Sequence, residues 1–261
     1  MLQHHIADPH LKKSFGMTVT AQHRGSAGRL PVERIRATPK PIAADILDRY
    51  RKLVDLSSTI SDILDRCGIV GAFGASNLPP TIGSARAIGR AITVRNARQP
   101  LDVRAVQEQG ANMMTEIEGM HQADPGDVLV IEGLRDISNM GGVMATVAHA
   151  TGLAGAIVDG GIRDVGHSRS LGFPIWARDV SPVTGKWRAV TQEINGPVTI
   201  NDITVHAGDL VVADETGIVF VPAAIVEDVL VECEAIQAKE NDWMKQIQNG
   251  LSIPDLVKKI F

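Results

Sequence analysis

The segment from Gly141 to Asp164, GGVMATVAHATGLAGAIVDGGIRD, constrains what this chain can fold into more than any other. Its pattern predicts a glycine-led loop, a short apolar helix, a buried strand and a turn that ends in Arg163-Asp164. The gap between Gly142 and Arg163 is 163 − 142 − 1 = 20 residues. Free amides at the start of a helix bind anions, and α/β sites usually lie at the carboxyl ends of strands.

The residue types at the two ends of this segment indicate a ligand class. An Arg side chain grips a carboxylate with two parallel hydrogen bonds, and a lone Asp with waters suits a hydrated Mg²⁺ ion. We therefore expect a small site for an anionic, oxygen-rich ligand and a hard metal. Taken by itself, Arg163-Asp164 is more typical of a solvated ion pair in a surface loop.

The remaining pattern predicts α+β (mixed α/β) architecture in one domain. Strands are expected at 87–94, 128–131 and 156–158, and the helices and loops between them favour parallel pairing with right-handed crossovers. From residue 187 onward, short β runs, among them 198–205, alternate with turn residues and indicate antiparallel pairing. A long helix is predicted from Pro222 to about Gln248.

Three parts of the chain differ in pattern. Residues 1–41 show no sustained period and read as an irregular arm, either wrapped on a neighbouring subunit or partly disordered. Residues 42–222 form the predicted α/β domain, and residues 223–261 a C-terminal helical extension. The long helix of that extension is expected either to contact another subunit or to pack on its own sheet.

Composition narrows the classes of partner and compartment. The net charge of −4 weighs against nucleic acid, whose binding requires clustered excess Lys and Arg. No apolar run reaches the roughly 20 residues that span a bilayer, so no membrane partner is expected. The polar start carries no signal-peptide core, and the 2 cysteines form no disulfide framework. A cytoplasmic location is expected.

Several common catalytic motifs are missing from the sequence. No glycine loop ends in a phosphate-binding Lys-Ser/Thr pair, and no GxGxxG lies between a strand and a helix. No HxH, HExxH or GxSxG motif occurs. Nucleotide use, a zinc site and a serine-hydrolase triad therefore lack support, and the Gly141–Asp164 segment remains the main candidate.

A glycine loop followed by x20 and Arg-Asp resembles the signature of the 4-hydroxy-4-methyl-2-oxoglutarate aldolases and regulator-of-ribonuclease-activity-A-like proteins. Further matches to this family extend the similarity over roughly residues 50–240. They are Pro125–Val130 (PGDVLV), Ile157–Gly160 (IVDG), Gly172–Ile175 (GFPI) and Gly208–Asp214 (GDLVVAD) leading to Gly217.

The resemblance implies a β/β/α swivelling-domain-like sandwich with N- and C-terminal helical extensions, assembled as a homotrimer or homohexamer. It implies a class II aldolase or decarboxylase of 2-oxo acids that works through a pyruvate enolate with Mg²⁺ (or Mn²⁺). By the same resemblance, Asp164 would be the metal ligand and Arg163 would bind substrate and stabilise the enolate oxygen. Gly141 and the amides of Gly142, Val143 and Met144 would hold the pyruvyl carboxylate.

The sequence departs from the family pattern at two positions. His167 and Gly142 stand where characterised members often carry acids. His167 is either a metal ligand or base, or a surface helix residue. Three other positions are weaker candidates. Glu240 matches a glutamate that the family supplies from the adjacent subunit, or is an exposed helix acid. Lys186 or Arg188 would reach the distal carboxylate of a dicarboxylate substrate; the alternative is that they are surface charges on a β-hairpin.

His121, Glu116 and Glu118 are loose candidates on the segment before the Pro-Gly-Asp turn.

The function expected first is a divalent-metal-dependent carbon–carbon lyase acting on a small-molecule 2-oxo acid, by retro-aldol cleavage or decarboxylation. The alternatives are a non-catalytic regulatory binding protein of the ribonuclease-regulator type, and a metal-dependent lyase or isomerase with another substrate. Fold alone does not choose between them, because function depends on the site.

Overall fold

The computed structural model describes residues 24–110 and 112–260, so residues 1–23 of the predicted arm lie outside the described residues. A nine-stranded mixed sheet has the order β1-β11-β10-β2-β3-β5-β4, with β6 paired to β5 and β7 paired to β2. Its strands are β1 (Ala72–Gly74), β2 (Ala87–Arg98), β3 (Val128–Glu132), β4 (Ser138–Met140), β5 (Gly155–Ile162), β6 (Ile175–Val180), β7 (Ala189–Ile194), β10 (Leu210–Ala213) and β11 (Gly217–Val221).

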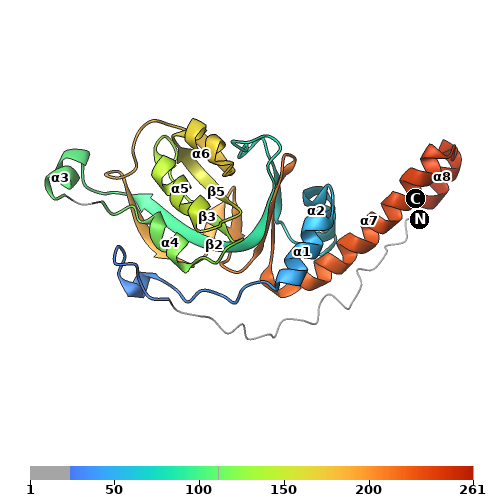
Figure 1. The fold of residues 1–261 in the computed structure, drawn as a ribbon, viewed down its shortest axis with the longest axis horizontal. Helices are drawn as coiled ribbons and strands as arrows, with labels where there is room; N and C mark the ends of the chain where they lie inside the picture. The colour runs from blue at the N-terminus through green and yellow to red at the C-terminus, as the bar shows by residue number, and fades with distance from the viewer. Residues whose placement is uncertain (1–23, 111, 261) are drawn as a thin grey trace.

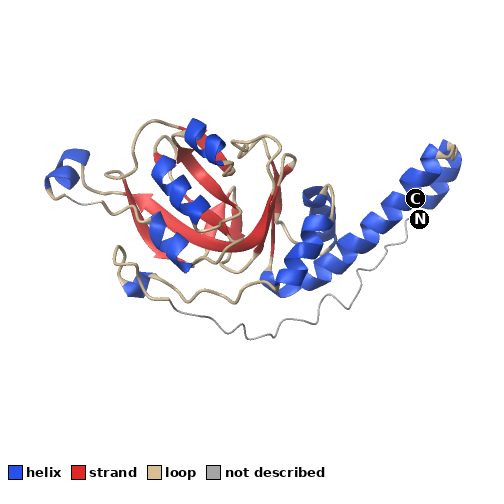
Figure 2. Ribbon diagram, in the orientation of Figure 1, coloured by secondary structure: helices blue, strands red, loops and turns tan. Residues whose placement is uncertain are grey.

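The long strand β2 joins the parallel and antiparallel parts of the sheet. Residues 87–90 pair antiparallel with β10, residues 91–95 pair parallel with β3, and the far half pairs antiparallel with β7. The sheet curls around this strand (Figure 2). The parallel centre and the antiparallel strands after residue 187 confirm the expected mixed α/β fold class.

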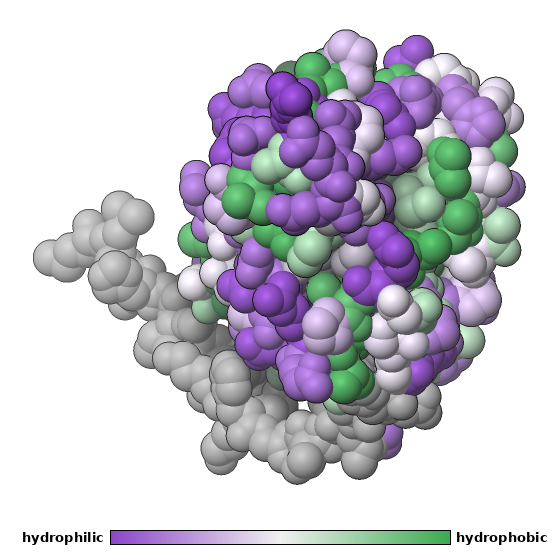
Figure 3. All heavy atoms as spheres, turned by 90° about the vertical axis from the view of Figure 1, so that its left-hand side faces the viewer, coloured by the Kyte–Doolittle hydropathy of each residue, from purple (hydrophilic) through white to green (hydrophobic). Residues whose placement is uncertain are grey.

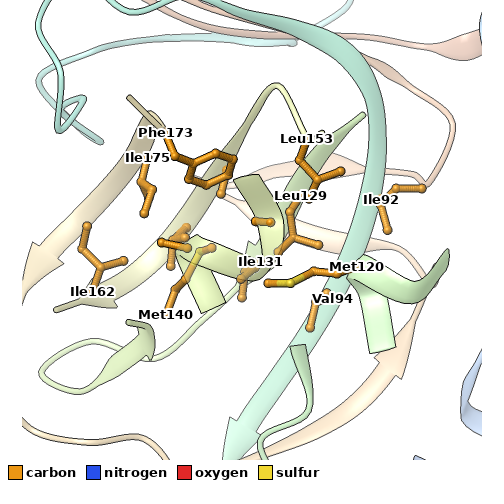
Figure 4. Close-up of a cluster of buried hydrophobic side chains, with 14 of the residues drawn as sticks. Ile92, Val94, Met120, Leu129, Ile131, Met140, Leu153, Ile162, Phe173 and Ile175 are labelled. Carbon is orange, nitrogen blue, oxygen red and sulfur yellow. The ribbon is translucent and has the colours of Figure 1, made fainter. Parts of the chain in front are cut away.

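Helices cover one face of the sheet and a hairpin covers the other, which gives β/β/α layering. The helices α4 (Glu116–Gln122), α5 (Gly142–Ala150) and α6 (Val165–Leu171) lie along the first face (Figure 1). Between them and the sheet lies a buried apolar cluster that includes Met120, Leu129, Ile131, Phe173 and Ile175 (Figure 4). The hairpin β8–β9 (Val198–Ile200, Ile203–Val205) packs on the opposite face.

The hairpin corrects one prediction. The β run expected at 198–205 is two short strands, because Asn201 and Asp202 adopt left-handed backbone angles (φ +47° and +65°) and turn the chain back. Asn and Asp tolerate this region better than β-branched residues do. The tight turn brings Asn201 to the sheet, where its amide donates to the Asp159 carboxylate at 2.6 Å.

The C-terminal helix begins on the body and continues beyond it. After a 3₁₀ turn, η3 (Ala223–Ile225), α7 (Val226–Gln248) buries Val229, Leu230 and Cys233 against α1 (Ala44–Lys52) and α2 (Leu56–Arg66). The later turns of α7 lead away from the body to α8 (Ile253–Ile260) (Figure 1). The first half therefore packs on helices of its own chain, and the subunit contact stays a prediction.

The described part of the arm, residues 24–41, crosses the body and includes the 3₁₀ turn η2 (Val32–Arg34). The remaining described helix, α3 (Val103–Glu108), lies on a projecting loop (Figure 1). The face on that side mixes hydrophilic and hydrophobic residues (Figure 3). Among the described residues, no helix combines the length and the apolar composition that crossing a bilayer requires.

Candidate active site

The glycine loop and the Arg-Asp turn meet because β4 and β5 are neighbouring parallel strands. The loop follows β4 and the turn follows β5, so both lie at the same edge of the sheet, and the 20-residue gap is filled mostly by α5 and β5. The Arg163 amide donates to the Met140 carbonyl at 3.0 Å. The Gly142 amide donates to the Asp164 carboxylate at 2.8 Å. The loop and the turn are thus hydrogen-bonded to each other.

Close packing explains why glycines lead the loop. A Cβ at Gly141 would lie 2.9 Å from Arg163 Nε and 3.1 Å from an Asp164 carboxylate oxygen. A Cβ at Gly142 would meet softer limits, 3.2 Å from His167 Cδ2 and 3.3 Å from Asp164 Cβ. An acid at Gly142, as in the family pattern, would therefore point directly at the Asp164–His167 pair.

The Arg-Asp turn has a restricted backbone. Asp164 adopts φ +57°, a left-handed angle, at the N-terminus of α6. Arg163 Nε lies 3.5 Å from the Asp164 carboxylate, and their side chains are 35% and 48% exposed. Both are accessible to a ligand, and the hydrogen bond from the Gly142 amide orients the Asp164 carboxylate. This arrangement is more constrained than a freely solvated ion pair.

Beside this turn lies a cavity of about 330 Å³. Five predicted substrate-binding residues line it: Gly141, Val143, Met144, Arg163 and Lys186. The other lining residues come from the arm, from α4 and the segment that leads into it, from β4 and from the loop after β6. They are Arg29, Asn112, Met114, Glu116, Ile117, Ser138 and Thr184.

Asp164 and His167 lie on the α6 side of the glycine loop and do not line this cavity. His167 Nε2 lies 2.9 Å from the Thr146 hydroxyl, and its amide donates to the Asp164 carbonyl. No cluster of three or more His, Cys, Asp or Glu side chains suited to a metal occurs within the described ranges. One half-exposed carboxylate and one nearby imidazole fit a Mg²⁺-type ion that keeps several waters, rather than an ion caged by protein.

The remaining predicted residues are placed elsewhere. Glu240 lies on the part of α7 that leaves the body, away from the cavity of its own chain. Arg188 turns back to the Thr184 carbonyl, to which it donates at 3.1 Å. His121 contributes its backbone carbonyl to Arg24. A role for Glu240 in a neighbouring subunit's site stays a prediction.

Electrostatically, the cavity favours anions. Arg29, Arg163 and Lys186 contribute three positive charges, and Glu116 is the one acid among the described residues that line it. Glu116 is 3% exposed, and burial raises its pKa to about 7. Removal from water disfavours the carboxylate form, which explains the direction.

The arm supplies Arg29 through an anchor on α4. The buried Glu118 carboxylate accepts hydrogen bonds from the amides of Ala27 (2.7 Å), Arg29 (2.6 Å) and Leu30 (3.1 Å) and from the Ser26 hydroxyl (3.1 Å). Burial by itself would raise the pKa of Glu118, but these donors outweigh it, so the pKa lies below its usual value. The Arg29 guanidinium also donates to the Asn112 carbonyl at 2.9 Å.

Comparison with known proteins identifies the family. The family model described as RraA-like, Aldolase/RraA, matches residues 57–220, more than half of the chain. The chain belongs to the RraA-like family. Its resemblance to this family, expected from the Gly141–Asp164 segment, is confirmed.

Individual relatives agree with the family assignment. A candidate 4-hydroxy-4-methyl-2-oxoglutarate aldolase of Halalkalibacterium halodurans is 29% identical over 209 residues, covering 79% of this chain and 90% of that protein. An uncharacterized protein of Pseudomonas syringae pv. tomato has a solved structure that matches with a TM-score of 0.70 at 28% identity, covering 84% of this chain and 96% of that one.

A third match supports the fold alone. Streptomyces coelicolor RraAS2, titled an unusual member of the RNase ES inhibitor RraA protein family, superposes with a TM-score of 0.63 at 22% identity. The superposition covers 81% of this chain and 99% of that chain. The expected RraA-type sandwich is thereby confirmed, while Arg29 precedes the family match and belongs to this chain's own arm.

Proposed function

We propose that this chain is a carbon–carbon lyase that acts on a 2-oxo acid in the cavity beside the glycine loop, with a divalent ion such as Mg²⁺ (or Mn²⁺). The observation that carries the proposal is the meeting of an anion-binding loop and Arg163 at a cavity with three cationic side chains, while Asp164 is hydrogen-bonded to the same loop on its α6 side. Membership in the Aldolase/RraA family supports the same reaction class.

The first turn of α5 would bind the substrate carboxylate. Because the Gly142 amide already donates to Asp164, the amides of Val143 and Met144 are the ones left for a ligand. The helix dipole adds to their attraction for an anion. Arg163, at the mouth of the same cavity, would orient the 2-oxo acid and offset negative charge as the carbon–carbon bond breaks.

Asp164 would hold the ion, and His167 is a second donor within reach of the same turn. When bound, a divalent ion would draw electron density from the 2-oxo group and favour enolate formation. Around that ion the chain itself orients the carboxylate of Asp164, because the Gly142 amide fixes one of its oxygens at 2.8 Å. A trimer or hexamer, in which Glu240 of a neighbouring subunit reaches this site, belongs to the same proposal.

The test is a coupled pyruvate assay over a panel of 4-hydroxy-2-oxo acids and oxaloacetate, with and without Mg²⁺. Asp164→Ala is expected to abolish metal-dependent pyruvate release, while Asp62→Ala, an exposed acid on α2, serves as the matched control. Pyruvate release that is equally fast with EDTA, or in Asp164→Ala, would contradict the proposal.

One observation favours a second candidate. Within the described ranges, no group of three or more potential metal ligands occurs at the turn, and Gly142 and His167 stand at positions where family enzymes often carry acids. A non-catalytic binding protein would fit that loss. If no substrate in the panel yields pyruvate and Mg²⁺ leaves thermal stability unchanged, a stoichiometric protein partner becomes the better account. Release of a product other than pyruvate would indicate a lyase or isomerase with another substrate.

A further inference from the structure

Glu116 is a carboxyl group inside the cavity to which the proposed reaction has so far assigned no role. It is the first residue of α4, and only 3% of it is exposed. Apolar side chains from α4, its leading segment and α5 share the cavity wall with it, namely Ile117, Met114 and Met144. A carboxyl group buried beside apolar surface normally needs a partner, since an unpaired buried charge is costly.

No group within residues 24–110 and 112–260, other than its own amide, donates a hydrogen bond to the Glu116 side chain. Glu118, two residues away, receives four donors instead. The charged groups around the cavity are Arg29 from the arm, Arg163 from the end of β5 and Lys186 from the loop after β6. Burial outweighs the hydrogen bond from the residue's own amide, and the pKa of Glu116 rises to about 7.

The proposed retro-aldol reaction requires one proton transfer within the site. The C3–C4 bond of a 4-hydroxy-2-oxo acid breaks, its electron pair moves to C3, and C4 becomes a carbonyl as the 4-hydroxyl loses its proton. C3 then takes up one proton to become the methyl group of pyruvate. The proton lost from the hydroxyl and the proton gained by C3 balance, so one residue that accepts and returns a proton closes the cycle.

We propose that Glu116 is this residue, accepting the proton of the substrate 4-hydroxyl and delivering it to C3 of pyruvate. The inference rests on the proposed lyase function and assigns it a catalytic base. Glu116 suits the task because it lines the same cavity as Arg163 and Lys186, and among the described residues only its own amide donates to its side chain. A group that titrates near neutral pH can both take and return a proton at useful rates.

The reverse half of this transfer is measurable without an aldol substrate. In D₂O with Mg²⁺, Glu116 would remove a proton from the methyl group of pyruvate, so ¹H NMR would follow deuterium entering C3. Glu116→Gln is expected to slow this exchange, and cleavage of 4-hydroxy-4-methyl-2-oxoglutarate, by about 10²-fold or more. Glu116→Asp, which keeps the ionisable group, is expected to restore part of both rates.

Decarboxylation of oxaloacetate supplies the internal control. Loss of CO₂ leaves the electron pair on C3 without any base, and water can then protonate C3. Glu116→Gln should therefore slow this decarboxylation much less than it slows cleavage, and should still bind pyruvate. The wild-type exchange rate should rise with pH to a plateau above about 7, and Glu108→Gln, an exposed acid of α3, should behave as wild type.

The outcomes distinguish a failure of the proposed lyase function from a failure of the proposed role of Glu116. If wild type forms pyruvate from no substrate and exchanges no C3 proton, the lyase function and the role of Glu116 are both wrong. If wild type is active and Glu116→Gln matches it, only the role of Glu116 is wrong. If Glu116→Gln loses decarboxylation as severely as cleavage, or loses pyruvate binding, its effect is structural and the inference is overturned.

Discussion

Replacing Glu118 by Gln should release the N-terminal arm from α4 while leaving the sheet folded. The buried carboxylate accepts three backbone amides and one hydroxyl from residues 26–30. A Gln side chain has one acceptor oxygen, and its NH₂ group would face amide donors that need acceptors. The substitution thus removes the negative charge and leaves at least one amide without a partner.

The size of the effect follows from these bonds. A hydrogen bond to a charged group contributes about 1.5–3 kcal/mol, and contributions that share one acceptor are not additive. A loss of about 2–3 kcal/mol is therefore expected for arm docking. Since each 1.4 kcal/mol is about tenfold in an equilibrium, the opening equilibrium of the arm should shift by roughly 30- to 140-fold.

Amide hydrogen exchange at neutral pH measures this opening directly. In Glu118→Gln, the protection of the Ala27, Arg29 and Leu30 amides should fall by that factor, while β3 and β5 amides keep theirs. Glu33→Gln, an exposed acid on the same arm, is the matched control. Unchanged protection at the Leu30 amide, or an equal loss of protection across the sheet, would refute the argument that Glu118 anchors the arm.

The pH dependence of the anchor at Glu118 has a defined sign. The pKa of Glu118 is lowered in the native state. The stabilisation from the ionised Glu118 carboxylate is therefore fully present above the unfolded-state pKa, and it is lost as the pH falls through the lower native pKa. Protection of Leu30, corrected for intrinsic exchange, should thus decline only in acid. Glu118→Gln should lack this decline, because its side chain does not titrate.

Two further predictions concern the glycine loop and the buried network beneath the arm. Gly141→Ala should lower activity more than Gly142→Ala. The new Cβ would lie 2.9 Å from Arg163 Nε at position 141, but 3.2 Å from His167 Cδ2 at position 142. Steady-state kinetics of the two variants would measure the difference, and equal losses of activity would contradict the packing argument. Asp127→Asn should destabilise by about 3 kcal/mol in urea unfolding, because Asp127 pairs at 2.5 Å with Arg90, which is 1% exposed. Asp48→Asn, in an exposed pair, should change stability by less than about 1 kcal/mol, and a similar loss in both would contradict this prediction.

The central site was predictable because it is built within one continuous segment. The loop after β4, helix α5, strand β5 and the Arg163-Asp164 turn follow each other in sequence, and parallel neighbours bring their carboxyl ends together. Periodicity and glycine positions suffice for such a unit. The same reasoning placed the parallel strands and the long C-terminal helix, whose starts differ from expectation by a few residues.

Arg29 could not be foreseen in this way. It lies more than a hundred residues from Arg163 and Lys186, and no motif links them. Its place at the cavity depends on the anchor at Glu118, a set of contacts between residues 88 to 92 positions apart in sequence and on separate elements. Local pattern carries no information on such pairings, which are decided when the arm packs on α4.

Glu116 and Glu118 differ in ways that the sequence does not predict and that tertiary packing decides. Both are glutamates in one short helix, two positions apart, and the sequence alone assigned them only loose candidacy. Because residues i and i+2 do not share a helix face, packing sends one to the cavity and the other to the arm. Among the described residues, the first receives a hydrogen bond from its own amide alone and its pKa rises to about 7, while the second receives four donors from the arm and its pKa falls. The sequence by itself determined the glycine loop, the Arg-Asp turn and the succession of strands along the chain; only the tertiary structure decided the opposite pKa shifts of these two acids, because burial and donor geometry depend on segments distant in the chain.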